Sequence, residues 1–262
     1  MKTLSKLFSI ATIASLNVAC ASGASSAKTA TQPLPRACPG QHVTTDGQAR
    51  ALAGCTRIEG GLTVSGAVTT LAPLASVQAV RGTLAIKSTR GFVSLDGLER
   101  LHEVTHLVLS DNPQLEDISA LGSLAAVGSI TLTQNPSLET LRGLEGVRSL
   151  ERLTIEQSGL FTLRGLDNLA AVRALVIAKN PRLIQLHALS ELRSVEQLTI
   201  VGNRRLSGYG GLLQNLERRP TSVRVSGNPV TVTEIAHLTS SAPRRSNAGF
   251  GTIDTNRVAS AQ

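Results

Sequence analysis

An apolar pair of the form Leu-x-Ile returns along this chain at nearly constant intervals, and this period limits the possible folds more than any other feature. The intervals are 22, 23, 23, 23, 22, 23 and 25 residues. A fixed period of this length indicates a solenoid, in which each coil buries its apolar side by stacking on its neighbours. The eight pairs begin at Leu62, Leu84, Leu107, Ile130, Leu153, Leu175, Leu198 and Val223.

Each repeat divides into an alternating segment and a turn. In residues 107–127, LVLSDNPQLEDISALGSLAAV, apolar and polar residues first alternate, which predicts a strand. Asn-Pro then ends the strand and starts a turn. We expect the asparagines at this place to stack into a structural ladder along the solenoid, with each side chain hydrogen-bonding the backbone of the bend. They are Asn112, Asn135, Asn180, Asn203 and Asn228.

The second half of the repeat carries apolar residues spaced by three, which could also indicate a helix. Gly97, Gly143 and Gly165 lie inside it, and glycine weakens helices but suits tight bends. We therefore expect extended segments with turns. Aromatic residues make up only 2% of the chain and Trp is absent, so the core must be aliphatic and a ring-lined ligand pocket is not expected.

The N-terminal residues resemble an export signal. Lys2 and Lys6 precede an apolar run that is too short to span a membrane, which predicts a signal peptide over residues 1–19. The segment Leu16-Asn17-Val18-Ala19-Cys20 resembles a bacterial lipobox, which implies a lipid on Cys20, although Leu16 lies one position further from the cysteine than is usual. Ordinary cleavage near Ala19 is the alternative.

Two further cysteines, Cys38 and Cys55, are separated by sixteen residues. In an exported chain we interpret them as a disulfide, the alternative being two buried free thiols. Residues 20–37 are mostly small and polar and are interrupted by two prolines, which predicts a lipidated N-terminus followed by a flexible tether. Beyond it we expect a disulfide-linked cap over 38–61, the repeats over 62–238, and a disordered tail over 239–262.

The segments VQAVRGTLAI, AAVGSITLTQNPSLETLRGLEGV and SVEQLTIVGNRRL resemble receptor L-domain repeats. That family includes ligand-binding modules of insulin- and growth-factor-type receptors and many bacterial envelope proteins. The resemblance covers about residues 38–238, and the spacing is also similar to leucine-rich repeats. It implies a mainly β, right-handed β-solenoid of about eight coils with a parallel sheet. No ligand carries over, because no residue-level binding motif is visible.

His102, Glu103 and His106 form a literal H-E-x-x-H, which on a helix would hold zinc beside a general base. Here Val104 and Leu107 occupy the repeat's core positions, so the segment is expected to be a strand. No third ligand stands out among His42, His187 and His237. Glu116, Asp117, Glu139 and Glu145 are expected in exposed turns. We predict no catalytic residues, no metal and no cofactor.

Alternation along the strands sends one column of side chains outward. We interpret it as a possible binding face for an extended or carbohydrate-like partner, although β-branched residues also favour strands for purely structural reasons. Without aromatic anchors or clustered Arg, high affinity for a protein is not expected. The column is Thr63, Ala85, Val108, Thr131, Thr154, Val176, Thr199 and Arg224.

These features favour a non-enzymatic cell-envelope lipoprotein, a monomer that presents a repeat scaffold for recognition or adhesion of a protein or polysaccharide. Ala21 after the lipid site resembles an outer-membrane or surface signal. The net charge of +8 falls to +6 without Lys2 and Lys6, because 24 basic residues then face 18 acidic ones. Nucleic acid is not expected, since the Arg residues are scattered. A purely structural envelope protein is the alternative, and a zinc hydrolase using His102, Glu103 and His106 is a remote one.

Overall fold

In the computed structural model, residues 35–209, 212 and 215–229 are described. The predicted signal peptide, Cys20, most of the predicted tether and the predicted tail lie outside these residues, as do positions 230–238 of the predicted repeats.

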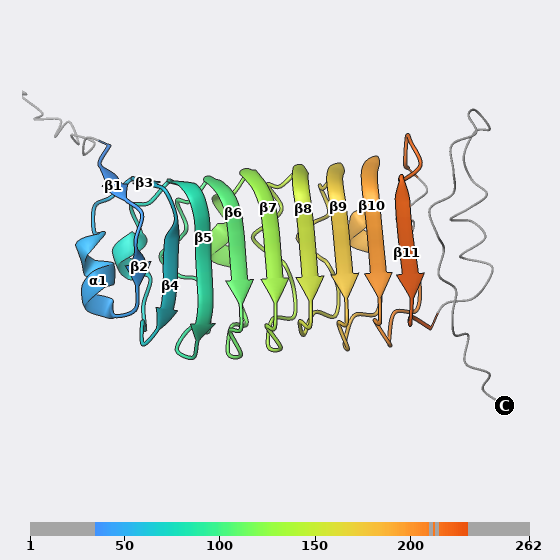
Figure 1. Ribbon diagram of the computed structural model, residues 1–262. Coiled ribbons are helices and arrows are strands. Elements are labelled where there is room, and N and C mark those ends of the chain that lie inside the picture. The colour runs from blue at the N-terminus through green and yellow to red at the C-terminus, as the bar shows by residue number, and fades with distance from the viewer. Residues whose placement is uncertain (1–34, 210–211, 213–214, 230–262) are drawn as a thin grey trace, which may run out of the picture. The chain divides into compact units, whose positions relative to one another are not determined.

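The described residues form a β-solenoid of about eight turns with one parallel sheet, which confirms the predicted class of fold (Figure 1). Each coil contributes one strand, and the first residues of neighbouring Leu-x-Ile pairs are register partners, as in Leu107 with Ile130 and Leu198 with Val223. The period therefore gives the register directly. The strands are β4 (Leu62–Gly66), β5 (Ala79–Thr89), β6 (Glu103–Ser110), β7 (Ala126–Thr133), β8 (Ser149–Glu156), β9 (Ala171–Ala178), β10 (Ser194–Val201) and β11 (Ser222–Ser226).

The core lies between the sheet and the turn segments behind it. Both residues of each pair point inward, and Leu107, Leu109, Ile130 and Leu132 are fully buried. Turn-side leucines such as Leu121 close the same layer from behind. Burying one such side chain contributes about 1.5–3 kcal/mol to the free energy of folding. One aliphatic layer per coil is therefore sufficient to form the core without many aromatic rings.

The cap over the first described residues is continuous with the sheet. It contains β1 (Ala37–Pro39), β2 (His42–Val43), α1 (Asp46–Ala51) and β3 (Arg57–Glu59). Strand β1 pairs with β3, which pairs with β5, while β2 pairs with β4. Cys38 and Cys55 form a disulfide with 5.9 Å between their Cα atoms, as predicted. The disulfide ties β1 to the segment that follows α1.

Helix α1 closes the end of the core, and the repeat pattern did not predict it. Thr45 caps it by accepting a hydrogen bond from the Gln48 amide. Asp46 accepts hydrogen bonds from the Thr69 amide and hydroxyl, at 2.8 and 2.7 Å, and these hold the pKa of Asp46 below its ordinary value of 3.8. The cap is thus fixed to the next coil by a charge-assisted pair of hydrogen bonds.

The turn side is built in two ways. Three coils carry short 3-10 helices, which the sequence analysis did not predict: η1 (Ala72–Leu74), η2 (Ser119–Ser123) and η3 (His187–Leu189). Three others turn at Gly97, Gly143 and Gly165, whose φ angles are 110°, 104° and 112°. Only glycine adopts such angles readily, so these residues mark tight bends as expected.

One left-handed residue lies at the end of each strand or in the bend that follows it. From β4 to β11 its φ lies between 50° and 72°, and in five coils the residue is not glycine. Such a conformation costs about 1–2 kcal/mol for an ordinary side chain. The residues are Gly66, Ser88, Asp111, Gln134, Gln157, Lys179, Gly202 and Gly227.

The asparagine that follows the left-handed residue bonds to the preceding coil. The side-chain amide of Asn180 donates to the Ile155 carbonyl at 3.0 Å, and its carbonyl oxygen accepts from the Ser158 backbone N–H at 3.0 Å. The asparagines therefore bond the backbone of a bend, as expected, but the bend belongs to the preceding coil, so the bonds run mainly between coils. Ser158 occupies the ladder position between Asn135 and Asn180 and interrupts the series. The equivalent donations to backbone carbonyls of the preceding strand are from Asn112 to Ile86, Asn135 to Leu109, Asn203 to Ile177 and Asn228 to Ile200. The side-chain amides of Asn112, Asn180 and Asn203 also donate to the side-chain oxygen of the next asparagine, which is Asn135, Asn203 and Asn228 respectively.

Candidate functional site

The predicted binding column lies on the outer side of the sheet. Its eight residues are register partners from one strand to the next, from Thr63 with Ala85 to Thr199 with Arg224. Thr131 and Thr154 are half-buried. Ala85 is only 2% exposed, because its methyl group lies between the longer Thr63 and Val108 side chains. It therefore adds little contact surface.

Two further outward columns flank this one, and we call the three columns together the strand face. Its basic side chains include Lys87, Arg152 and Arg224, and its acidic side chains include Glu156. The flanking columns are His106, Ser129, Arg152, Ala174, Gln197 and Ser222 on one side, and Ser65, Lys87, Ser110, Thr133, Glu156, Ala178, Val201 and Ser226 on the other.

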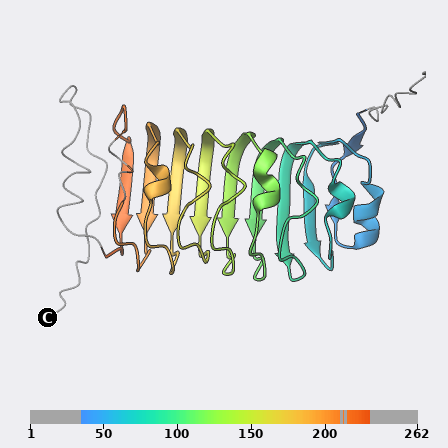
Figure 2. The same ribbon diagram turned by 180° about the vertical axis from the view of Figure 1, so that it is seen from behind.

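The strand face is broad and open. In Figure 1 the strands stand in front of the turn segments, and in Figure 2 the 3-10 helices stand in front of the strands. Among the described residues, no segment crosses the outer side of the sheet. Equivalent side chains on the strand face repeat at the spacing between neighbouring strands, about 4.8 Å.

The H-E-x-x-H segment does not have the geometry of a zinc site. Glu103 begins β6, so His102 and His106 are not one helical turn apart. The Nδ1 atom of His106 lies 2.7 Å from the Ser129 hydroxyl on the strand face, whereas that of His102 lies 3.4 Å from the Arg100 carbonyl. Within the described ranges, no group of three His, Cys, Asp or Glu could hold a metal, and His237 lies outside them.

The carboxylates singled out in the sequence lie in turns, where two of them make local hydrogen bonds and one makes an ion pair with a more distant coil. Asp117 accepts from the Ser119 amide, and Glu145 accepts from the Gly143 amide at 2.7 Å. Glu139 forms an ion pair with Arg182, while Glu116 is exposed. Glu116 and Asp117 lie in one coil and Glu139 and Glu145 in the next, and three of the four are engaged in the bonds just named.

A groove on the turn side was missed by the sequence analysis. This rear groove, of about 450 Å³, spans three consecutive coils. The sequence feature that pointed to this groove was Phe161, a half-buried ring in an aromatic-poor chain. The repeat period alone, however, does not show which side chains surround that ring. The lining residues are Glu139, Thr140, Arg142, Phe161, Thr162, Arg164, Asp167, Gln185, His187 and Ala188.

Arg182 lies at the edge of the rear groove and contacts two of its lining residues. Its guanidinium carbon lies 3.7 Å from the centroid of the Phe161 ring, a cation–π contact. Its Nη2 atom lies 3.0 Å from a carboxylate oxygen of Glu139. One side chain thus links three coils through a ring and a carboxylate.

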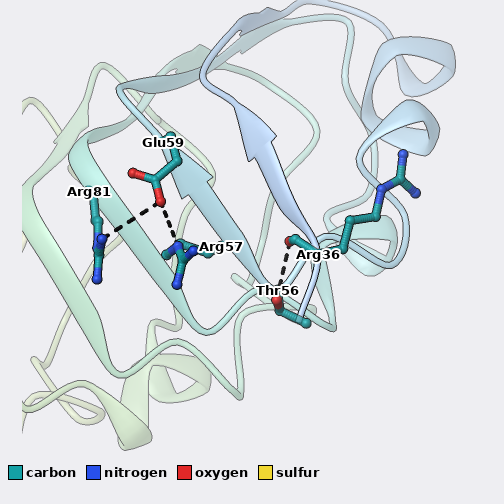
Figure 3. A network of polar contacts seen from close by, with 5 residues as sticks. All are labelled: Arg36, Thr56, Arg57, Glu59 and Arg81. Carbon is teal, nitrogen blue, oxygen red and sulfur yellow. Dashed lines mark hydrogen bonds and ion pairs between the residues drawn. The ribbon is translucent and has the colours of Figure 1, made fainter. Parts of the chain in front are cut away.

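A cluster of arginines near the first described residues makes structural contacts (Figure 3). Arg57 and Arg81 share Glu59, at 2.6 and 3.8 Å, and all three side chains are at least 40% exposed. Exposed pairs of this kind contribute little, about 0–1 kcal/mol each. Arg36 points away from Glu59 and donates to the Ala53 carbonyl, while its own carbonyl accepts from Thr56.

Comparisons with known proteins give no family for the chain. No protein-family model matches it, and no curated protein matches it. Among the helices within the described residues, none is long and apolar enough to cross a membrane. The candidate binding surfaces are therefore the strand face and the rear groove.

Proposed function

We propose that the protein is a non-enzymatic cell-envelope lipoprotein that presents the strand face to an extended protein or polysaccharide. The observation that carries the proposal is the strand face itself. Its side chains repeat in register from β4 to β11, and no described segment crosses it. An extended partner can contact equivalent positions on successive strands, so several weak contacts together increase the overall affinity.

The location at the envelope rests on the predicted signal peptide and the lipobox-like segment ending at Cys20. The Cys38–Cys55 disulfide is compatible with export, because disulfides persist in oxidising compartments. The resemblance to receptor L-domains also supports a recognition role. A lipid on Cys20 would hold the solenoid at the outer membrane through the tether.

The proposal is tested with Thr131→Asp and Thr154→Asp combined in a Cys20→Ser background, which removes the lipid from the comparison. The probe is association of the purified protein with isolated envelopes of the source cells. We expect the double substitution to weaken association about tenfold, because it places two charges at the centre of the strand face. Gln114→Asp with Ala125→Asp is the matched control, since both residues are exposed and lie outside the strand face and the rear groove.

Thermal unfolding of each variant verifies that the solenoid is intact. Unchanged association by an intact double variant would count against a docking face. It would instead favour the purely structural alternative, in which the β-branched column serves only the sheet.

A further inference from the structure

We propose that the rear groove is a binding site for an acidic oligosaccharide, one carboxylate of which bridges Arg142 and Arg164. This site goes beyond the proposed function of the strand face, because it lies on the opposite side of the coils and uses none of the same residues.

Arg142 and Arg164 occupy equivalent positions on adjacent coils. Each precedes the glycine of the same kind of turn, and the backbone N–H of Leu141 donates to the Arg164 carbonyl at 2.9 Å. Both side chains are exposed, and in the described part of the chain neither makes an ion pair. Like charges on neighbouring extended segments repel each other. A carboxylate placed between the two guanidinium groups removes that repulsion and accepts hydrogen bonds from both.

The acidic residues of the groove are already engaged. Glu139 is paired with Arg182, and Asp167 accepts a hydrogen bond from the Gly165 amide at 2.8 Å. Arg182 itself adds a positive charge beside the groove. Arg182 thus offsets the charge of Glu139, while Asp167 keeps its negative charge. Three arginines (Arg142, Arg164 and Arg182) face these two carboxylates, so the groove and its edge carry one net positive charge, which favours an acidic ligand.

The remaining lining suits a sugar better than a free anion. Thr140, Thr162 and Gln185 contribute one hydroxyl or amide per coil, at the strand spacing of about 4.8 Å. The length of one pyranose residue in an extended glycan is close to this spacing, so successive sugar hydroxyls meet successive polar side chains. Arg182 covers one face of the Phe161 ring. The rest of the ring and the neighbouring Ile184, which is 37% exposed, offer apolar surface to the carbon face of a sugar ring.

The test is calorimetric titration of the full chain, carrying Cys20→Ser, with tetragalacturonate, with the neutral cellotetraose and with inorganic phosphate. We expect saturable binding of the acidic tetramer only. Arg142→Gln with Arg164→Gln is expected to raise its dissociation constant about tenfold or more, since both charge-assisted contacts are lost. The matched control is Arg148→Gln with Arg193→Gln, which removes the same charge from exposed positions outside the groove and is expected to leave binding unchanged.

Several results would overturn the proposal. Absence of saturable binding would remove the site. Equal binding of cellotetraose would show that the arginine pair is not used, and equal binding of phosphate would show an anion site without sugar recognition. An equal loss in the control would indicate non-specific charge attraction. The variant with both Thr131→Asp and Thr154→Asp keeps the rear groove intact, so it should still bind tetragalacturonate. Its binding therefore distinguishes failure of the rear-groove proposal from failure of the strand-face proposal.

Discussion

Replacing Asn180 with alanine is expected to lower the free energy of unfolding by about 4 kcal/mol. The change leaves the Ser158 N–H and the Ile155 carbonyl, two groups that Asn180 satisfies inside the molecule, without their partner. Each unsatisfied buried group costs about 1–3 kcal/mol. The left-handed Lys179 just before it would then be held by fewer bonds. Urea denaturation followed by circular dichroism measures the loss.

Asn168→Ala is the matched control for the ladder. Asn168 is exposed and donates one hydrogen bond to the Glu145 carbonyl at 2.9 Å. Because water can replace that bond, we expect a loss of about 1 kcal/mol or less. The Asn168 bond also joins two coils, but it is exposed, whereas those of Asn180 are buried. If both substitutions destabilise the protein equally, the buried bonds of the asparagine ladder are not what holds the bends in place.

A methyl group at Gly165 is expected to destabilise the solenoid by about 3 kcal/mol or more. The φ angle of Gly165 is 112°, which alanine adopts only with strain, and its new Cβ would overlap the Leu141 carbonyl of the preceding coil. Moving the backbone to relieve that contact would also disturb the hydrogen bond from the Gly165 amide to Asp167. The thermal midpoint and hydrogen exchange in the adjacent strands report the effect.

Gly122 provides the comparison on the same, turn side of the solenoid. It lies in η2, it has no left-handed φ, and an added Cβ would meet nothing within 4 Å. Gly122→Ala is therefore expected to leave stability unchanged or to raise it by up to about 1 kcal/mol, because alanine loses less conformational entropy on folding. A destabilisation as large as that of Gly165→Ala would contradict this explanation of the turn glycines.

The repeat period was sufficient to predict the register of the sheet. Leu62, Leu84 and Leu107 are spaced so that one residue per coil must stack, and parallel strands follow directly from that stacking. The H-E-x-x-H segment was assigned to a strand for the same reason, since Val104 and Leu107 keep the core positions.

Features that depend on the neighbouring coil could not be predicted in the same way. The direction of the asparagine bonds depends on which carbonyl of the preceding strand lies within reach of each side chain, as Ile155 does for Asn180. The rear groove joins residues of three coils around Phe161, and no local pattern connects them. Helix α1 is six residues long, too short for apolar periodicity to reveal.

The two surfaces offer different kinds of contact. The strand face is wide and mixes small side chains with charged ones such as Lys87, Arg152 and Glu156, which suits an extended partner bound through many weak contacts. The rear groove has a volume of about 450 Å³ and contains a ring and an arginine pair, which suits a short charged ligand. A protein with both could hold one polymer along its sheet while recognising a sugar group behind it.

Photocrosslinking in intact cells tests the role of the strand face most directly. A photoreactive amino acid replaces Thr154, at the centre of the face, or Gln114, an exposed residue outside it. We expect an adduct of higher mass from position 154 and not from position 114, and we expect Thr131→Asp to abolish it. No adduct from position 154, or equal adducts from both positions, would contradict the assignment of the strand face as the recognition surface.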